Sequence, residues 1–145
     1  MSQENVEIVR RFQPTPDLDI AVLFRDDAAW VAMREGAASV LHEDFAAGVR
    51  ILDDQAPLLP GVDGLRSTWL DWLEPWEGYR TEIEDVIDVG EERVLVLTRD
   101  YGRRVGSNAE VRLHGAGLYT MRDGKIALAE FMPRDEALKA VGLEE

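Results

Sequence analysis

An acidic residue at the end of an apolar run is the first candidate for chemistry in this chain. Asp100 follows the run at residues 94–98, where a carboxylate departs from the pattern of a buried strand. If the strand holds Asp100 in an apolar interior, burial raises the pKa of its carboxyl, and the group can act as a proton shuttle. If the strand has instead reached solvent, Asp100 pairs with Arg99 or Arg103 at a strand end, and such a pair contributes little.

Two histidines are further candidates, because histidine is the residue type most suited to proton transfer. His114 alternates with Glu110 and Arg112 on one face of an expected strand, opposite the apolar face, so we expect His114 at a surface or an interface. His42 has two acidic neighbours but no second histidine at ligand spacing. We therefore expect no metal site.

Aromatic residues could form the wall of a binding cavity. Trp69, Trp72 and Trp76 have the spacing of one helical face, a pattern that is typical of a core and that could also border a pocket. Three tyrosines could each offer a hydroxyl to a ligand oxygen: Tyr79, Tyr101 and Tyr119. Each could equally be half-buried, with its hydroxyl in water.

Composition excludes several classes of function. The 145 residues carry a formal net charge of −13, which argues against nucleic acid and anionic membranes as partners. The chain has no cysteine, hence no thiol nucleophile or zinc-thiolate site, and this fits a cytoplasmic location. No apolar run approaches the roughly 20 residues that span a bilayer. Without a phosphate-binding loop or a dinucleotide fingerprint, we expect no cofactor.

Helical patterns in the first half and strand patterns in the second predict an α+β fold, with one domain over residues 1–145. We expect a short helix near residues 6–12, a second that follows an N-cap at Thr15, and a third over residues 28–41. Two more are expected over residues 65–74, with Asp63 as cap, and from Pro133 to Gly142. The expected strands are 45–54, 79–89, 92–102, 109–121 and 125–132. Asp123 and Gly124 give the strongest hairpin signal.

Two glycines stand inside the strand predicted at residues 109–121. Gly115 and Gly117 would let a long strand bend sharply or let another segment approach closely. A bent sheet with helices over its concave side leaves a cavity between the layers. We expect the missing side chains to widen that cavity.

Three stretches resemble the SnoaL-like branch of the nuclear transport factor 2-like superfamily: MSQENVEIVRR at the start, GVDGLRSTWLDWLEPWEGYR in the middle, and LYTMRDGKI running to EALKAVGL at the end. The resemblance is weakest over residues 13–45, where His42-Glu43-Asp44 stands in place of the family's usual His-Pro-Asp. It implies a cone, in which a curved mixed sheet wraps around N-terminal helices. The pocket of such a cone is mostly apolar, with a few carboxylate, histidine or tyrosine groups.

Relatives include polyketide cyclases, ketosteroid isomerases, scytalone dehydratase and limonene-epoxide hydrolases. Gly117 falls near the position of the acidic hydrogen-bond donor of ketosteroid isomerases. Of the three polar groups of limonene-epoxide hydrolases, one aspartate falls on Asp100, but the arginine falls on Thr98 and the second aspartate on Phe131. The resemblance therefore argues against epoxide hydrolysis and implies a pocket without an intact catalytic set.

We therefore predict that the cavity binds a small hydrophobic or polycyclic molecule. The predicted ligand-binding residues are Trp69, Trp72, Thr98, Val111, Leu113, Gly117, Ala129 and Phe131. The alternative is a cofactor-independent enzyme of the polyketide cyclase, ketosteroid isomerase or dehydratase type. In that enzyme Asp100 abstracts a proton next to a carbonyl, and a tyrosine hydroxyl, for which Tyr119 is the candidate, stabilises the enolate oxygen.

The outer face of the sheet is expected to be an interface. We predict a homodimer through this face, including Arg112 and His114, because no helix is left to cover it and twofold dimers are the commonest soluble oligomers.

Overall fold

The computed structural model of the protein describes residues 2–49 and 58–143. The helices within these residues are α1 (Ser2–Phe12), α2 (Ile20–Arg25), α3 (Asp27–Ala37), α4 (Gly61–Leu73) and α5 (Arg134–Ala140). The strands are β1 (Leu41–Val49), β2 (Leu59–Pro60), β3 (Trp76–Gly90), β4 (Arg93–Arg104), β5 (Glu110–Arg122) and β6 (Lys125–Pro133). The predicted strand at 45–54 runs beyond residue 49 into a part that lies outside the described residues.

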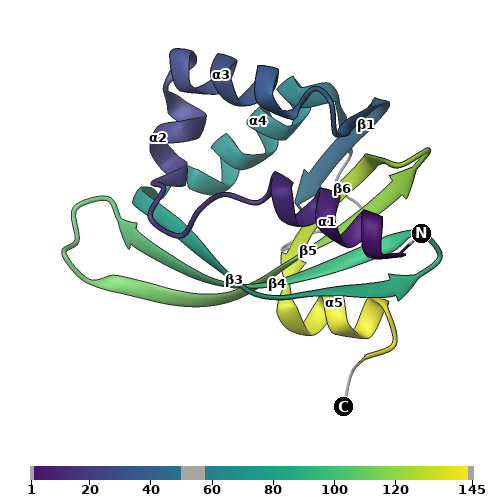
Figure 1. Cartoon of the computed structure of the whole chain (residues 1–145). Helices are drawn as coiled ribbons and strands as arrows, with labels where there is room; N and C mark the ends of the chain where they lie inside the picture. The colour runs from purple at the N-terminus through teal and green to yellow at the C-terminus, as the bar shows by residue number, and fades with distance from the viewer. Residues whose placement is uncertain (1, 50–57, 144–145) are drawn as a thin grey trace.

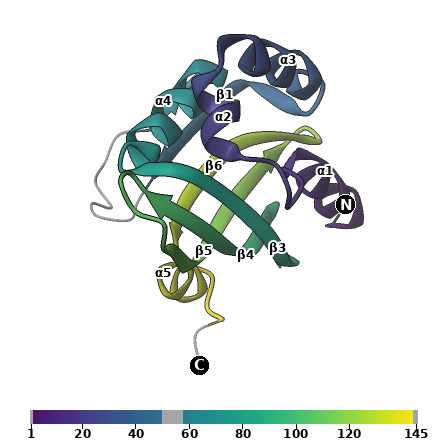
Figure 2. The ribbon, with the colours of Figure 1, turned by 90° about the vertical axis from the view of Figure 1, so that its left-hand side faces the viewer.

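One mixed sheet, in the order β2-β1-β6-β5-β4-β3, contains every strand of the described residues. Strands β3 to β6 pair antiparallel as successive hairpins, and β1 joins β6 in parallel. Asp123 and Gly124 both have positive φ, as a tight hairpin turn requires. The sheet curves, and α1 to α4 lie on one side of it (Figures 1 and 2). The α+β prediction of a curved mixed sheet around N-terminal helices is confirmed.

Two helices in the first half have boundaries other than those predicted. Helix α2 is capped by Asp19 rather than Thr15, because the Asp19 carboxylate accepts a hydrogen bond from the backbone N–H of Ala21 at 2.9 Å. Helix α3 ends at Ala37 rather than at Leu41, because Leu41 already pairs with Ile126 at the start of β1.

The tryptophan pattern is shared between two elements. Helix α4 ends at Leu73, so Trp69 and Trp72 are helical but Trp76 belongs to β3. The Trp76 ring lies against Gly102, where an added Cβ would come within 2.5 Å of it. The prediction of one helical face for all three tryptophans is therefore wrong. Helix α4 also begins earlier than predicted, at Gly61, so that Asp63 lies in its first turn.

Helix α5 covers part of the outer face of the sheet, so the prediction of a face without helices is wrong (Figure 2). Ala137 of α5 is fully buried in a cluster with outward-facing residues of the sheet. That cluster includes Leu95, Ala116, Leu118 and Met132. The larger core lies on the inner side, between the sheet and the other helices. No helix of the described ranges is long and apolar enough to cross a membrane.

Candidate functional site

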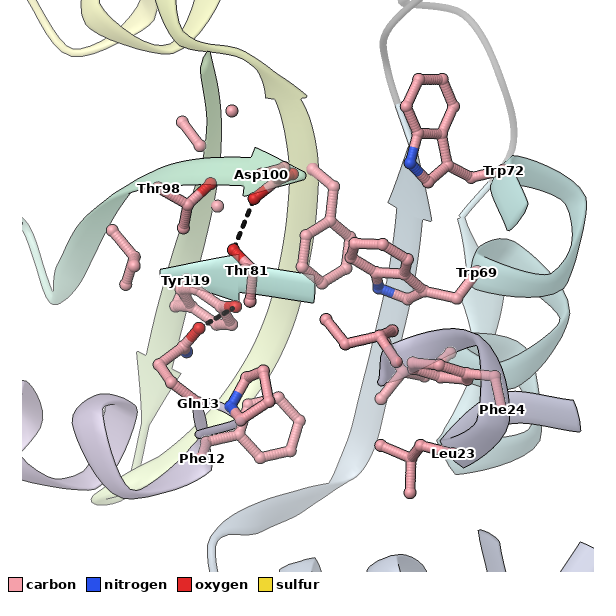
Figure 3. A pocket seen from close by; sticks show the side chains of 18 of the residues that line it. Phe12, Gln13, Leu23, Phe24, Trp69, Trp72, Thr81, Thr98, Asp100 and Tyr119 are labelled. Atoms are coloured by element: carbon pink, nitrogen blue, oxygen red, sulfur yellow. Dashed lines mark hydrogen bonds between the residues drawn. The ribbon is translucent and has the colours of Figure 1, made fainter. Parts of the chain in front are cut away.

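A cavity of about 630 Å³ lies between the inner face of the sheet and helices α1 to α4 (Figure 3). Much of its wall is aromatic, and the rings come from both layers: Phe12, Phe24, Trp69, Trp72, Tyr79, Tyr119 and Phe131. Phe24 stacks on Trp69, with 5.6 Å between the ring centroids, and Trp69 meets Phe131 edge to face at 5.1 Å. Contacts between rings from helices and rings from strands hold this wall together.

Asp100 lines the cavity and is only 8% exposed. It lies on the inner face of β4, opposite Thr81 of β3 on one side and Leu113 of β5 on the other. The two arginines considered as its partners are engaged elsewhere. Arg99 pairs with Glu84 at 2.9 Å, and Arg103 pairs with Glu77 at 3.0 Å. The interpretation of Asp100 as a solvent-exposed ion-pair residue is therefore wrong.

Hydroxyl groups from β3 hold the Asp100 carboxyl. Tyr79 donates to Oδ2 at 2.7 Å, and Thr81 donates to Oδ1 at 2.5 Å. Burial raises the pKa of Asp100, and the hydrogen bonds from Thr81, Tyr79 and Thr98 offset part of that rise. Burial, and then the neighbouring Asp100, also raise the pKa of Tyr79, so its hydroxyl remains a proton donor.

The two glycines of β5 make room for these side chains. A Cβ added at Gly115 would lie 2.9 Å from the Thr98 hydroxyl and 3.1 Å from the Asp100 carboxylate. A Cβ added at Gly117 would lie 2.8 Å from the Tyr119 ring. The expectation that the glycines widen the cavity is therefore wrong. The space above them is filled by polar groups of the site, which a larger residue would displace.

Tyr119 offers a second hydroxyl within the cavity lining. It donates to the Gln13 side chain over 3.5 Å, and Figure 3 shows the two side chains facing one another. Burial raises the pKa of Tyr119 to about 12, which keeps the hydroxyl a neutral donor. Tyr101, by contrast, bonds to Glu82, which faces away from the cavity, and Tyr101 is not part of its lining.

Six of the eight predicted ligand-binding residues line the cavity: Trp69, Trp72, Thr98, Leu113, Gly117 and Phe131. The other two do not. Val111 is 37% exposed and lies beyond the lining, near the turn between β4 and β5, and Ala129 is fully buried in the core. Alternation along β5 and β6 gave the correct face for both, but it carries no information on how far along the strand the cavity extends.

Several lining residues were not predicted. Thr81 is one of them; it lies two residues after Tyr79, a predicted hydroxyl candidate, and this spacing would have placed it on the same face of β3, toward Asp100. Gln13 and Phe24 come from the poorly matched residues 13–45 and Phe12 directly precedes them, and no sequence signal distinguishes these three from ordinary core residues.

The two histidines lie at different places in the fold, and His114 only partly matches its prediction. His114 is exposed in β5 opposite Arg99, as predicted, but it also belongs to the cavity lining, so its predicted position away from the cavity is wrong. His42 lies near Asp44 and Asp123 at the start of β1. The part of the chain that the structure describes contains no group of three or more metal-ligating side chains.

A family model for a SnoaL-like domain matches residues 24–129. The match confirms the resemblance seen in the sequence, and it includes part of the region where that resemblance is weakest. No curated protein matches the chain.

Solved structures share the fold. A protein from Jannaschia sp. CCS1, described as a SnoaL-like polyketide cyclase, is 18% identical, with a TM-score of 0.63 over 99% of this chain and 94% of that one. TerC, crystallised with polyporic acid, is 19% identical, with a TM-score of 0.63 over 95% and 97%. An NTF2-like protein from Burkholderia xenovorans LB400 is 22% identical, with a TM-score of 0.59 over 97% of each chain. At these identities the likeness establishes the fold alone.

Proposed function

The chain belongs to the SnoaL-like domain family, and from this premise we propose that its cavity binds a small, mostly apolar molecule. The observation that carries the proposal is the aromatic cavity of about 630 Å³. Cavities that hold small molecules are typically about 300–1,000 Å³, with mostly apolar walls and a few polar groups that orient the ligand. Asp100, Thr81 and Tyr119 supply such polar groups here. That the similar protein TerC was crystallised with polyporic acid also supports a small-molecule ligand.

A fluorescent apolar probe tests the proposal without knowledge of the natural ligand. N-phenyl-1-naphthylamine, which is neutral and becomes bright in apolar surroundings, should show saturable binding to the protein. Leu113→Trp enlarges a side chain of the lining and should weaken this binding by at least about tenfold, since an overfilled site must shift to admit the probe.

Val111→Trp is the matched control. It adds the same side chain to the same face of β5, but at a position outside the lining. This variant should bind the probe as the wild type does. Absence of saturable binding by the wild type would contradict the proposal, and equal binding by Leu113→Trp would show that the probe binds somewhere else.

A second candidate function is cofactor-independent acid–base catalysis, because the Asp100 carboxyl faces the cavity instead of solvent. A carboxyl whose pKa is raised by burial can take a proton from the carbon next to a carbonyl at moderate pH. The Tyr119 hydroxyl, also on the lining, would stabilise the enolate oxygen. The bond from that carbon to hydrogen breaks, and Asp100 holds the proton until it is returned to another position.

Proton exchange tests this chemistry directly. A ketone that displaces the probe should exchange its α-hydrogens for deuterium faster with the protein than without it, as followed by NMR. Asp100→Asn should slow the exchange by at least about 100-fold, as expected for loss of a general base. Equal exchange by the variant would remove Asp100 from the role of base, and no exchange by the wild type would leave the protein a binder.

Two broader expectations are also proposals. We propose that the protein forms a homodimer through the outer sheet face, and that it is located in the cytoplasm, which fits the absence of cysteine.

A further inference from the structure

We infer that the ligand of this cavity is a cationic amine, with its ammonium group at the Asp100 carboxylate and its apolar groups against the aromatic wall. The inference rests on the proposed function, because it names the class of molecule that the same cavity would bind. Asp100 then serves as a counter-ion instead of a base.

The first observation is a buried carboxyl without a cationic partner. Among residues 2–49 and 58–143, no lysine, arginine or histidine forms an ion pair with Asp100. Its hydrogen bonds come from neutral hydroxyls, those of Tyr79, Thr81 and Thr98. Burial of an ionised carboxylate is unfavourable unless a cation compensates it. A ligand ammonium group would supply that compensation.

Arg134 is the cation whose charge acts on Asp100 from nearby, and it is committed elsewhere. Its guanidinium donates to the backbone carbonyl of Thr98 at 2.6 Å and forms a close ion pair with Glu84. Glu84 is shared between Arg134 and Arg99, and neither arginine forms an ion pair with Asp100, so within the described residues the carboxyl has no cation in direct contact.

The second observation is that the aromatic wall begins at the carboxyl. Tyr79, which donates to Asp100, has its ring centroid 6.0 Å from that of Trp69 and 6.3 Å from that of Trp72. Phe131 continues the wall from Trp69. Ring faces attract cations, most strongly in desolvated sites and most strongly for tryptophan. A cavity that holds a carboxylate and indole rings on the same lining therefore favours an alkylated ammonium group over a neutral group of the same shape.

The charge of the whole molecule acts in the same direction. A net charge of −13 raises the local concentration of cations and lowers that of anions. The basic residues on the lining, Arg11 and His114, are both exposed to solvent, so their effect on the buried end of the cavity is screened.

Displacement of the fluorescent probe by two isosteric compounds tests the inference. Phenyltrimethylammonium carries a fixed charge, and tert-butylbenzene has the same shape with carbon in place of nitrogen. In the wild type, the ammonium compound should displace the probe at a concentration lower by at least about tenfold. Asp100→Asn should remove most of this preference while changing the affinity for tert-butylbenzene by less than about threefold.

A pH series on the wild type provides a test without a variant. The fixed cation should bind more tightly as the pH rises through the pKa of Asp100, because it favours the ionised carboxylate, and tert-butylbenzene should show no such rise. The other titratable or charged groups around Asp100 are Tyr79 of β3, Tyr119 of β5 and Arg134 of α5, and the same lining carries the exposed Arg11 of α1 and His114 of β5. The raised pKa values of both tyrosines keep them from titrating between acidic and neutral pH.

The outcomes separate this inference from the proposed function. Equal affinity for the two compounds, or a preference that survives in Asp100→Asn, would overturn the amine inference and leave the proposed cavity function intact. Failure of the probe and both compounds to bind would overturn the proposed function itself. A preference for the cation that depends on Asp100 and grows with pH would support both.

Discussion

Asp100 is a carboxyl that the fold removes from water and then surrounds with hydroxyl groups. Two opposing effects act on its pKa, which burial raises and the hydrogen bonds from Tyr79 and Thr81 lower. The balance is a raised pKa, which distinguishes Asp100 from an ordinary surface aspartate. Gly115 is part of this arrangement, since any side chain there would occupy the space of the carboxyl. This arrangement underlies both roles proposed for Asp100, as a counter-ion for a cationic ligand and as a general base.

The raised pKa of Asp100 predicts a pH-dependent loss of stability. In the folded state the carboxyl holds its proton more tightly than in the unfolded chain, where the pKa is near the ordinary value of 3.8. Stability from this group is therefore complete below that value and is lost as the pH rises through the folded pKa. Urea unfolding at several values between about pH 4 and pH 7 should show the wild type losing stability relative to Asp100→Asn. A difference that is independent of pH would contradict the raised pKa.

Helices and strands were predictable to the extent that their signals are local. The hairpins follow from apolar runs separated by turn residues, and Asp123-Gly124 takes the positive φ angles that its type favours. The boundaries of α2 and α3 were not predictable in this way, because a side-chain cap decides where α2 begins and a strand pairing decides where α3 ends. Six of the eight predicted ligand-binding residues were found on the lining, from helical spacing, strand alternation and family resemblance. The sequence did not predict that the space over Gly117 is filled, because this depends on the orientation of the Tyr119 ring.

The packing partner of helix α5 could not be predicted from the sequence. Its pattern predicted a helix but not a partner, and the structure places Ala137 against Leu95 and Leu118 on the outer face of the sheet. This contact is an apolar cluster of small and branched side chains. The helix therefore stabilises the outer side of the same strands that carry the cavity on their inner side.

Ala137→Glu should detach α5 from the sheet, because it places a charge in a fully buried position. We expect a decrease of at least about 2 kcal/mol in the free energy of unfolding, measured with urea. Ala140→Glu, the same change at an exposed position of the same helix, should alter stability by less than about 0.5 kcal/mol. Equal effects of the two substitutions would contradict the packing of α5 described here.

The molecule as a whole has two differently built sides. Its inner side holds helices α1 to α4 (Figure 1) and the cavity, and its outer side is covered by α5 at one end and carries charged side chains at the other. There, Arg80 lies over Tyr101, with Arg112 close to the same ring. Since α5 leaves this part of β4 and β5 uncovered, it is the surface through which we propose the homodimer.

Sedimentation velocity at micromolar concentration should give twice the mass of one chain. Arg112→Glu, which reverses a charge on the exposed outer face, should shift the protein toward monomer. Arg34→Glu makes the same change in α3, on the opposite side of the sheet, and should leave the dimer intact. A monomeric wild type would contradict the dimer proposal.

The binding of a small molecule in the cavity is the central claim, and the four tryptophans test it in one measurement. Trp69 and Trp72 line the cavity, whereas Trp30 and Trp76 are buried outside its lining. In a ¹H–¹⁵N correlation spectrum, with the indole signals assigned by Trp→Phe substitution, N-phenyl-1-naphthylamine should shift those of Trp69 and Trp72 saturably. The signals of Trp30 and Trp76 should move far less. Unchanged indole signals for Trp69 and Trp72 at saturating probe would contradict the claim.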